Sequence, residues 1–305
     1  MRRVLLWMAR NHWLRDHLPR LPFAKRAVRR FMPGETKEDA FAAGDLLMKE
    51  DIGILYTHLG ENLTEQAQAD EVAEHYKQVL DAVAGKSKPP EISVKPTQLG
   101  LDIDPERSFQ HASMLATYAK ERGSWLWLDM EGSPYVDPTL DQYERLKADH
   151  DNVGICLQAY LKRTAADVQR LLPLKPAIRL VKGAYSEPAS IAFKSKDEVN
   201  ASYLTLAVTI AEAAGQGNAR LALGTHDVEL VAKITDAAKA TGTAKSALEV
   251  HMLYGIRTDE LRKLRDKGYP AFDLVAYGEA WYAWYMRRLA ERPANVGFAL
   301  RQLLP

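Results

Sequence analysis

The sequence predicts an α/β protein whose strands close into a (βα)8 barrel of the TIM type. From residue 51 onward, eight short apolar runs rich in β-forming residues alternate with eight longer helical patterns. A doubly wound open sheet is the main competitor, and it would carry a glycine-rich phosphate-binding loop after its first strand. The first run reads ILYTHLGEN and has no G-x-G-x-x-G pattern. The closed barrel is therefore the predicted fold.

The apolar runs and the helical patterns between them set the expected boundaries. Strands are expected over residues 54–59, 91–96, 125–130, 153–160, 177–185, 220–224, 247–253 and 273–277. Helices are expected over 64–85, 105–122, 139–149, 164–172, 189–215, 228–241, 258–267 and 279–291. T-K-E-D at residues 36–39 is an imperfect capping box and predicts a further helix over 40–49. We assign residues 1–50 to an N-terminal helical arm and 51–305 to the barrel.

Composition and charge narrow the class of protein. The chain has 305 residues, of which 47% are hydrophobic and 27% charged, as is usual for a globular protein. Its net charge of +1 creates no overall field that would attract nucleic acid. The one cysteine, Cys156, rules out an intrachain disulfide and is expected to be a buried apolar residue. Without a long apolar run that could span a bilayer, we expect a cytoplasmic protein.

The first 31 residues stand out by their charge. They contain nine arginines and lysines against one acid, Asp16, with Trp7 and Trp13 interleaved. A basic amphipathic helix with tryptophans can lie in an anionic membrane surface. An arm packed on the barrel with a solvated basic face fits the same pattern, so the sequence leaves both interpretations open.

Polar residues follow the expected strands where catalytic groups of a (βα)8 barrel lie, at the carboxyl ends. Any one of them could be a solvated loop residue or a helix cap, as Asp227 would be for the helix after it. Their number predicts an active site at this end of the barrel. They are Glu61, Lys95, Asp129, Glu131, Gln158, Tyr160, Arg179, Lys182, Tyr185, Thr225, His226, Asp227, Glu249, His251, Tyr254 and Tyr277.

The fifth strand, AIRLVKGAY, carries a cation inside an apolar run. Arg179 would be costly to bury unless it is paired or holds a ligand. Lys182 follows it, and Gly183 lets the backbone approach another group closely. Pairing with a carboxylate from a neighbouring strand and binding of a ligand are equally consistent with this stretch.

The last expected helix contains two adjacent arginines, Arg287 and Arg288, in WYMRRLAERPAN. Their side chains point about 100° apart on a helix, so together they can hold a carboxylate or a phosphate from two sides. Glu291 lies one turn later and can orient either. The alternative is a surface helix with an intrahelical ion pair worth about 0.3–0.5 kcal/mol. The neighbouring Trp281 and Trp284 argue against full exposure.

The residues alone leave two classes of function open, and a third hypothesis is a barrel that has lost catalysis and binds a small amino acid as a sensor. A cofactor enzyme would use the cations of the fifth strand and the Thr-His pair of the sixth to hold an anionic organic cofactor. A metal-dependent lyase or hydrolase would use carboxylates and histidines, although no local motif such as HExxH is present. Its ligands would come from Asp129, Glu131, His226, Asp227, Glu249 and His251.

Seven stretches resemble the motifs of proline dehydrogenases, in the family's chain order and over roughly residues 35–305: SVKP, LDME, LQAYLKR, AIRLVKGAY, GTHD, EVHMLYG and WYMRRLAERPAN. The short monofunctional bacterial form is the most similar. The resemblance implies a distorted (βα)8 barrel with its last helix over the active site and noncovalent FAD. It also implies oxidation of L-proline to Δ1-pyrroline-5-carboxylate, the first step of proline catabolism to glutamate, by hydride transfer from proline C5 to flavin N5. A membrane quinone would take the electrons, and the basic arm could bring the protein to the inner face of the membrane.

The resemblance also assigns roles to single residues. Asp129 and Arg179 match the catalytic aspartate and the arginine beside flavin N5. The positions that match cofactor contacts are Met130, Gln158, Arg179, Lys182, Gly183, Ala184, Thr225 and His226. The positions that match substrate contacts are Lys95, Arg287 and Arg288, supported by Glu291, Tyr185, Leu253 and Trp284. No metal is implied.

Three positions depart from the family pattern. Trp284 stands where many members have a tyrosine, and His251 replaces a usual glutamine. A second pocket tyrosine aligns with Leu274, unless the alignment slips to Tyr277. Because these positions shape the ring pocket, the selectivity between proline and 4-hydroxyproline is left open.

Overall fold

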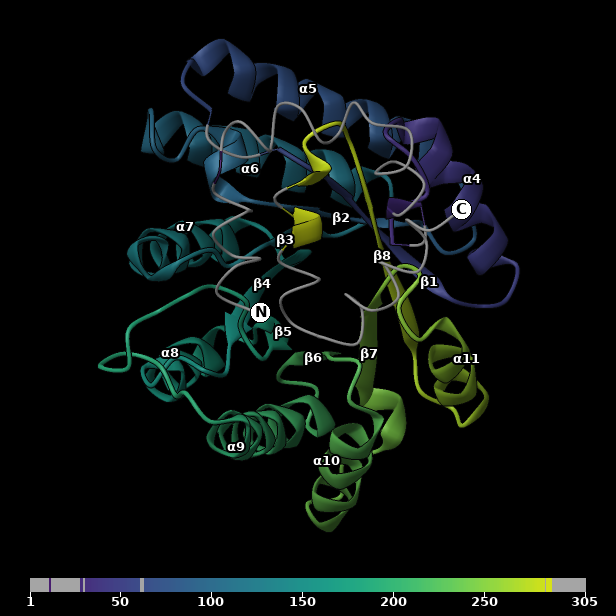
Figure 1. The fold of residues 1–305 in the computed structure, drawn as a ribbon, viewed down its shortest axis with the longest axis vertical. Coiled ribbons are helices and arrows are strands. Elements are labelled where there is room, and N and C mark those ends of the chain that lie inside the picture. The colour runs from purple at the N-terminus through teal and green to yellow at the C-terminus, as the bar shows by residue number, and fades with distance from the viewer. Residues whose placement is uncertain (1–10, 12–27, 30, 61–62, 283, 287–305) are drawn as a thin grey trace.

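Eight parallel strands form a closed barrel in chain order, which confirms the predicted fold (Figure 1). The computed structural model describes residues 11, 28, 29, 31–60, 63–282 and 284–286. The strands are β1 (Gly53–His58), β2 (Glu91–Val94), β3 (Leu126–Leu128), β4 (Val153–Gln158), β5 (Ala177–Val181), β6 (Arg220–Gly224), β7 (Leu248–Leu253) and β8 (Ala271–Tyr277). Pairing of β1 with β8 over six residues closes the ring.

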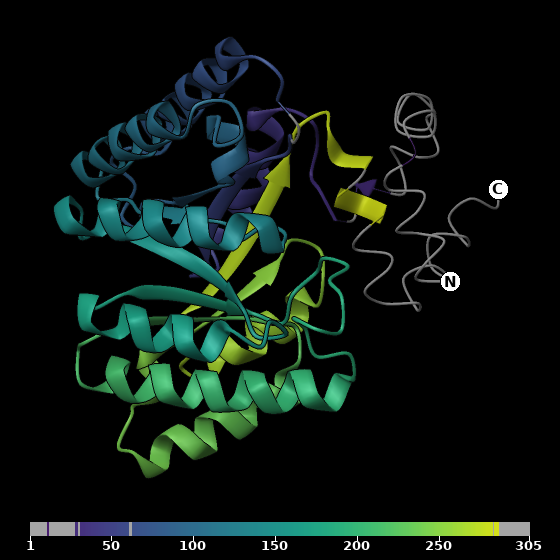
Figure 2. The same cartoon turned by 90° about the vertical axis from the view of Figure 1, so that its left-hand side faces the viewer.

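The helices surround the barrel (Figures 1 and 2). They are α4 (Lys37–Met48), α5 (Gln66–Val83), α6 (Pro105–Glu121), α7 (Val136–Asp149), α8 (Thr164–Leu171), α9 (Lys196–Gly215), α10 (Val228–Ala240) and α11 (Thr258–Asp266). Short 3-10 turns lie at η2 (Pro96–Leu99), η3 (Ser133–Tyr135), η4 (Leu172–Leu174) and η5 (Lys245–Ala247). Within the part of the chain that the structure describes, no helix has the length and apolarity needed to cross a bilayer.

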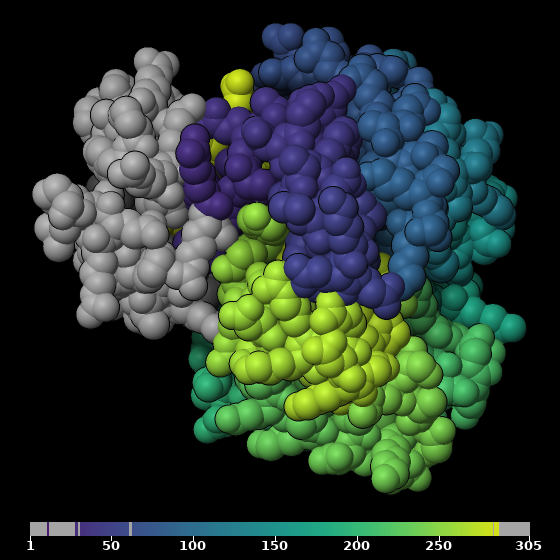
Figure 3. Space-filling model, turned by 90° about the vertical axis from the view of Figure 1, so that its right-hand side faces the viewer, coloured from purple at the N-terminus to yellow at the C-terminus, as the bar shows by residue number. Residues whose placement is uncertain are grey.

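Helix α4 begins at Lys37, directly after the capping residue Thr36 and three residues before the predicted start at 40, and it packs on the barrel wall. The Thr36 hydroxyl accepts from the Asp39 N–H at 3.1 Å. Ala40 and Leu47 are buried in the same core as Ile54 of β1. Figure 3 shows α4, in purple, between α5 in blue and α11 in yellow-green. The helix therefore covers the seam where β1 and β8 meet.

The start of α9 differs from the prediction. A helix was expected from residue 189, but α9 begins at Lys196, where Ser195 and Glu198 form a capping box. Residues 182–195 instead run back over the connection between β4 and α8, where Ala192 forms an antiparallel bridge with Leu161. The S-K-D-E pattern at 195–198 is the sequence signal that could have located this start.

Alternation along the strands separates two layers of core. One face of each strand packs on the helices, and the other fills the lumen of the barrel. Leu55, Trp127, Ala177 and Ala222 lie in the lumen, with Trp125, Phe272 and Leu274 packed against them. Gly154 faces Trp127, and a Cβ there would lie 2.4 Å from the indole ring. Only glycine leaves room for this tryptophan inside the barrel.

A buried charged network forms the floor of the lumen. Arg220 binds Glu91 at 2.7 Å and Glu249 at 2.8 Å, and Trp127 Nε1 donates to Glu91 at 2.5 Å. His251 Nε2 lies 3.0 Å from Glu249. Burial alone would raise the pKa of Glu249, but His251 and Arg220 outweigh it and hold that pKa at about 2.

The position of the floor network shows that one prediction was wrong. Glu249 and His251 were expected at the carboxyl end of the seventh strand. In the structure Glu249 lies near the amino-terminal end of β7 and His251 at its centre. The strand begins one residue later than expected and both side chains point into the lumen, so neither stands at the rim where the loops converge.

Stability is expected to fall on acidification. Burial lowers the pKa of His251 to about 4, against the opposing effect of Glu249. Between pH 6.5 and 4 the unfolded chain therefore binds a proton that the folded chain does not, and each such histidine lowers the free energy of unfolding by about 1.4 kcal/mol per pH unit. His251→Gln should show a shallower pH dependence in urea unfolding across this window. An unchanged slope would mean that His251 is protonated in the folded state.

Candidate active site

An ion pair crosses the lumen near the carboxyl ends of the strands. Arg179 of β5 is 4% exposed, and its Nη2 pairs with Asp129 Oδ1 just beyond β3. Burial acts to lower the pKa of Arg179, but the charge of Asp129 outweighs it, so the guanidinium stays protonated. The expected carboxylate partner exists, although β3 is not adjacent to β5. Among the residues that the structure describes, Arg179 Nη1 has no hydrogen-bond partner.

Gln158, the last residue of β4, presents an acceptor near this pair. Its Nε2 donates to the carbonyls of Met130 at 3.0 Å and Glu131 at 3.1 Å. Its Oε1 is buried and receives no hydrogen bond from the described residues. An orphaned buried acceptor costs about 1–3 kcal/mol, so the position suits a ligand that brings an N–H donor.

The segment after β5 turns sharply at Gly183. Its φ is +111°, and a Cβ there would lie 2.2 Å from the ring of Tyr160. The sequence predicts that the backbone at Gly183 approaches another group closely, and in the structure that group is the ring of Tyr160. Lys182 is held by Asn200 of α9 at 2.7 Å and by Asp227 at 2.8 Å. Ala184 and Tyr185 follow and are half-buried.

The residues after β6 are also tied in place. Asp227 accepts from the Leu230 N–H at 3.2 Å, which confirms it as the cap of α10. Thr225 Oγ1 accepts from the Asp227 N–H at 3.2 Å. His226 Nε2 accepts from the Leu253 N–H at 3.0 Å, so this nitrogen carries no proton. His226 therefore links the ends of β6 and β7, and Thr225 holds the turn that leads into α10.

Three further positions bear on the expected substrate pocket. Lys95 is buried directly after β2, two residues beyond Ser93, whose side chain reaches into the lumen. Leu274 packs inside the lumen, whereas Tyr277 points outward and its hydroxyl lies 2.7 Å from His75 Nε2. The lumen position therefore belongs to Leu274, and Tyr277 is not available to line a pocket there.

The residues of the metal alternative do not come together. Asp129 is paired with Arg179, and Glu131 accepts from the Thr97 N–H at 3.2 Å and from its hydroxyl at 2.8 Å. Asp227 holds Lys182, and Glu249 and His251 lie in the floor network. Throughout the described ranges, no three His, Cys, Asp or Glu side chains are grouped as a metal ion would require.

The residues of the expected carboxylate clamp, Arg287, Arg288 and Glu291, lie outside the described residues, as does Glu61. Residues 281–282 and 284–286 are helical and follow β8, and Trp284 is buried (Figure 2). Trp281 Nε1 donates to Glu35 at 3.0 Å. The beginning of this segment is thereby anchored on the chain that precedes α4.

Sequence reasoning missed Ser93. This serine is fully buried and bonds both members of the ion pair. It lies two residues before Lys95, on the same face of β2. Strand alternation counted back from Lys95 is the signal that could have identified it.

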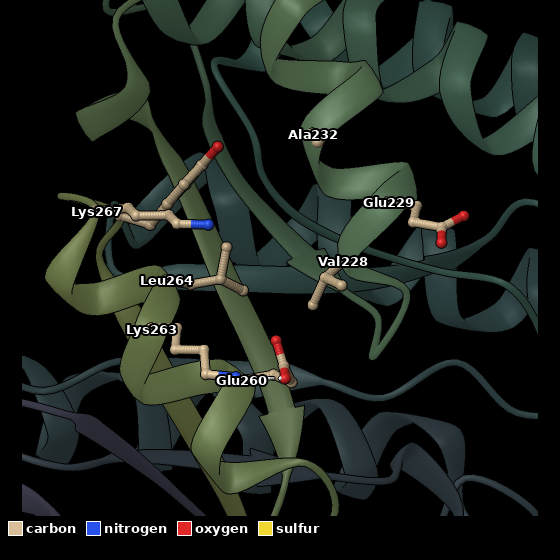
Figure 4. A pocket seen from close by; sticks show the side chains of 8 residues that line it. Val228, Glu229, Ala232, Glu260, Lys263, Leu264 and Lys267 are labelled. Carbon is tan, nitrogen blue, oxygen red and sulfur yellow. Dashed lines mark hydrogen bonds and ion pairs between the residues drawn. The ribbon is translucent and has the colours of Figure 1, made fainter.

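A cavity of about 230 Å³ lies outside the barrel, between α10 and α11 (Figure 4). Its lining residues come from α10, α11 and the turn after α11, and none of them is one of the predicted site residues. Its lining consists of Val228, Glu229, Ala232, Glu260, Lys263, Leu264, Lys267 and Tyr269.

Comparison with known proteins identifies the family. The proline dehydrogenase family model matches residues 42–301. Proline dehydrogenase 1 of Bacillus subtilis (strain 168) is 32% identical over 304 residues, covering 100% of this chain and 99% of the relative. Proline dehydrogenase of Deinococcus radiodurans is 34% identical over 280 residues, covering 90% and 89%.

Solved structures share the fold. Proline utilization A from Bdellovibrio bacteriovorus, inactivated by N-propargylglycine, superposes with a TM-score of 0.80 at 21% identity. The match covers 95% of this chain and 38% of that one. The family model and the relatives that align over nearly their whole length all bear the name proline dehydrogenase, and the closed barrel with a buried Arg–Asp pair near the carboxyl ends of its strands is consistent with them. The chain belongs to the proline dehydrogenase family.

Proposed function

We propose that the chain oxidises L-proline to Δ1-pyrroline-5-carboxylate with noncovalently bound FAD. The observation that carries the proposal is the pair of unsatisfied buried groups at this end of the lumen: the donor Arg179 Nη1 and the acceptor Gln158 Oε1. A flavin ring offers both N–H donors and carbonyl acceptors, so its chemistry fits this mixed set. Bound there, FAD would accept a hydride from proline C5 at flavin N5.

The residues at the ends of β3 to β6 would hold the cofactor. Arg179 supplies a permanent positive charge where negative charge develops as electrons arrive. Gln158 offers its acceptor while its amide nitrogen fixes the backbone of Met130. As the resemblance of the motifs implies, Lys182, Gly183 and Ala184 would lie along the cofactor, and Thr225 and His226 would lie beside it.

Lys95, Asp129 and the arginines of the last helix would handle the substrate. Arg287 and Arg288 would bind the proline carboxylate, Glu291 would orient them, and Lys95 adds a third cation. Hydride loss requires a neutral amine, because a protonated amine has no lone pair to assist departure. A lysine near the nitrogen favours that neutral form, and Asp129 balances the local charge. Tyr185, Leu253 and Trp284 would support the pocket.

We propose a membrane quinone as the electron acceptor, with residues 1–50 as an arm that brings a cytoplasmic barrel to the bilayer. The nine cations of residues 1–31 are the supporting feature. Deletion of residues 1–31 should abolish co-sedimentation with anionic vesicles. Equal sedimentation of the full and shortened chains would remove this role.

The deciding experiment is an anaerobic visible spectrum with L-proline titrated in. A flavin band that bleaches would establish cofactor and substrate class together. A yellow protein that does not bleach would point to a sensor or, given Leu274 in the lumen, to 4-hydroxyproline, which is titrated next. A colourless protein that cannot be reconstituted with FAD would overturn the proposal.

Replacing Arg287 tests the carboxylate clamp. Arg287→Met should raise KM for proline about tenfold to a hundredfold while FAD stays bound, because a charged hydrogen bond to the substrate is lost. Steady-state kinetics and the flavin-to-protein absorbance ratio check both parts. An unchanged KM would mean that the clamp is assigned to the wrong residue.

A further inference from the structure

We propose that Ser93 is a positioning residue that sets how much of the Arg179 charge reaches the cofactor. The inference rests on the proposed flavin function and deepens it. The Ser93 hydroxyl bonds Arg179 and Asp129. It acts through the two charged side chains that it joins.

The three side chains form a closed triangle. Arg179 Nη2 donates to Ser93 Oγ at 2.7 Å, and Ser93 Oγ donates to Asp129 Oδ1 at 2.9 Å. The third side is the ion pair between Arg179 Nη2 and the same Asp129 Oδ1. A hydroxyl has one donor and two acceptor sites, so a single serine serves both partners at once. Alanine could serve neither.

Ser93 reaches Arg179 across the lumen, since β2 and β5 are not neighbours in the barrel. It is fully buried, and Asp129 is 22% exposed. A hydrogen bond to a charged group in such surroundings is stronger than one in water. The hydroxyl donated to Asp129 offsets part of the carboxylate charge, so Asp129 cancels less of the positive charge on Arg179.

The backbone of Ser93 is held from behind the sheet. The Tyr76 hydroxyl of α5 donates to the Ser93 carbonyl at 3.0 Å and accepts from the His58 N–H at 2.9 Å. The paired residues of β1 and β2 end at Tyr56 and Ile92, just before these two groups. The Tyr76 side chain thus replaces the backbone hydrogen bonds between β1 and β2 where the two strands diverge. Ser93 keeps its position although no residue of β1 pairs with it directly.

Ser93→Ala should make the bound flavin harder to reduce. We expect the two-electron reduction equilibrium to shift about tenfold toward the oxidised form, which is a fall of about 30 mV in midpoint potential. The rate of flavin reduction by proline should fall by a similar factor. Spectroelectrochemical titration of the holoenzyme and anaerobic stopped-flow measure the two effects. Ser93→Thr keeps the hydroxyl and should restore both.

Ser124→Ala is the matched control. Ser124 is equally buried, but its hydroxyl donates to the Pro90 carbonyl at 2.6 Å, before the start of β3 and away from the ion pair. This variant should leave the potential and the rate unchanged. Equal shifts in Ser124→Ala and Ser93→Ala would mean that the effect is general loosening of the barrel.

A double-mutant cycle tests whether Ser93 acts through Asp129. In an Asp129→Asn background, Ser93→Ala should change the potential by less than half of its effect in the wild-type chain. If Ser93→Ala changes the potential as much in the Asp129→Asn background as in the wild-type chain, the proposed role of Ser93 is wrong, but the proposed function is not affected. The same holds if flavin-loaded Ser93→Ala keeps the wild-type potential. A wild-type chain that takes up no FAD would overturn the proposed function instead.

Discussion

Arg179→Met is expected to lower the rate at which proline reduces the bound flavin by about 10²–10³-fold. The guanidinium is a fixed positive charge in a dry part of the lumen, 4% exposed and held by Asp129 and Ser93. Such a preorganised charge stabilises developing negative charge without reorganisation of water. Methionine has a similar length and no charge, so the variant isolates the electrostatic contribution.

The flavin content of Arg179→Met shows whether a slower reduction comes from the missing charge or from missing FAD. Gln158, Thr225 and His226 remain, so we expect FAD to bind the variant. Arg145→Met is the control, because Arg145 pairs with Glu106 on the surface, where an ion pair contributes little. A flavin-loaded Arg179→Met that is reduced within threefold of the wild-type rate would show that the charge is not used in the reaction.

Arg220→Met is expected to destabilise the fold by about 3–5 kcal/mol. Arg220 is the cation between Glu91 and Glu249, which it binds at 2.7 and 2.8 Å. Removing it leaves two buried carboxylates without their cation, and burial already acts to raise the pKa of Glu91. Urea unfolding followed by tryptophan fluorescence measures the loss.

Arg170→Met provides the comparison for the floor network. Arg170 also binds two carboxylates, Asp141 and Glu144, but its side chain is 41% exposed. Removing the Arg170 side chain should lower the free energy of unfolding by less than about 1 kcal/mol. Equal destabilisation by the two substitutions would mean that the floor network contributes no more than a surface ion pair. Unchanged flavin binding in Arg220→Met would further separate the floor from the active site.

Local patterns predicted the secondary structure and the closed barrel. Eight apolar runs became β1 to β8, and the T-K-E-D capping box marks the start of α4. Motif order along the chain predicted the family before any contact was known. The main boundary error was at α9, because residues 182–195 are held by contacts with the β4–α8 connection. Contacts between separate segments do not change the hydrophobic periodicity of the local sequence, so the pattern could not predict them.

Periodicity and short motifs were sufficient to predict the barrel, the family and the residue types available at the carboxyl ends of the strands. Which charges meet depends on how the strands come together in the folded chain. The tertiary structure joins Arg179 to Asp129 and Ser93, and it sends Glu249 and His251 to the floor beside Arg220. Strand register and barrel closure determine these partners, which are up to 86 residues apart along the chain. Pairing at that separation depends on the geometry of the whole barrel, and the sequence around each residue does not encode it.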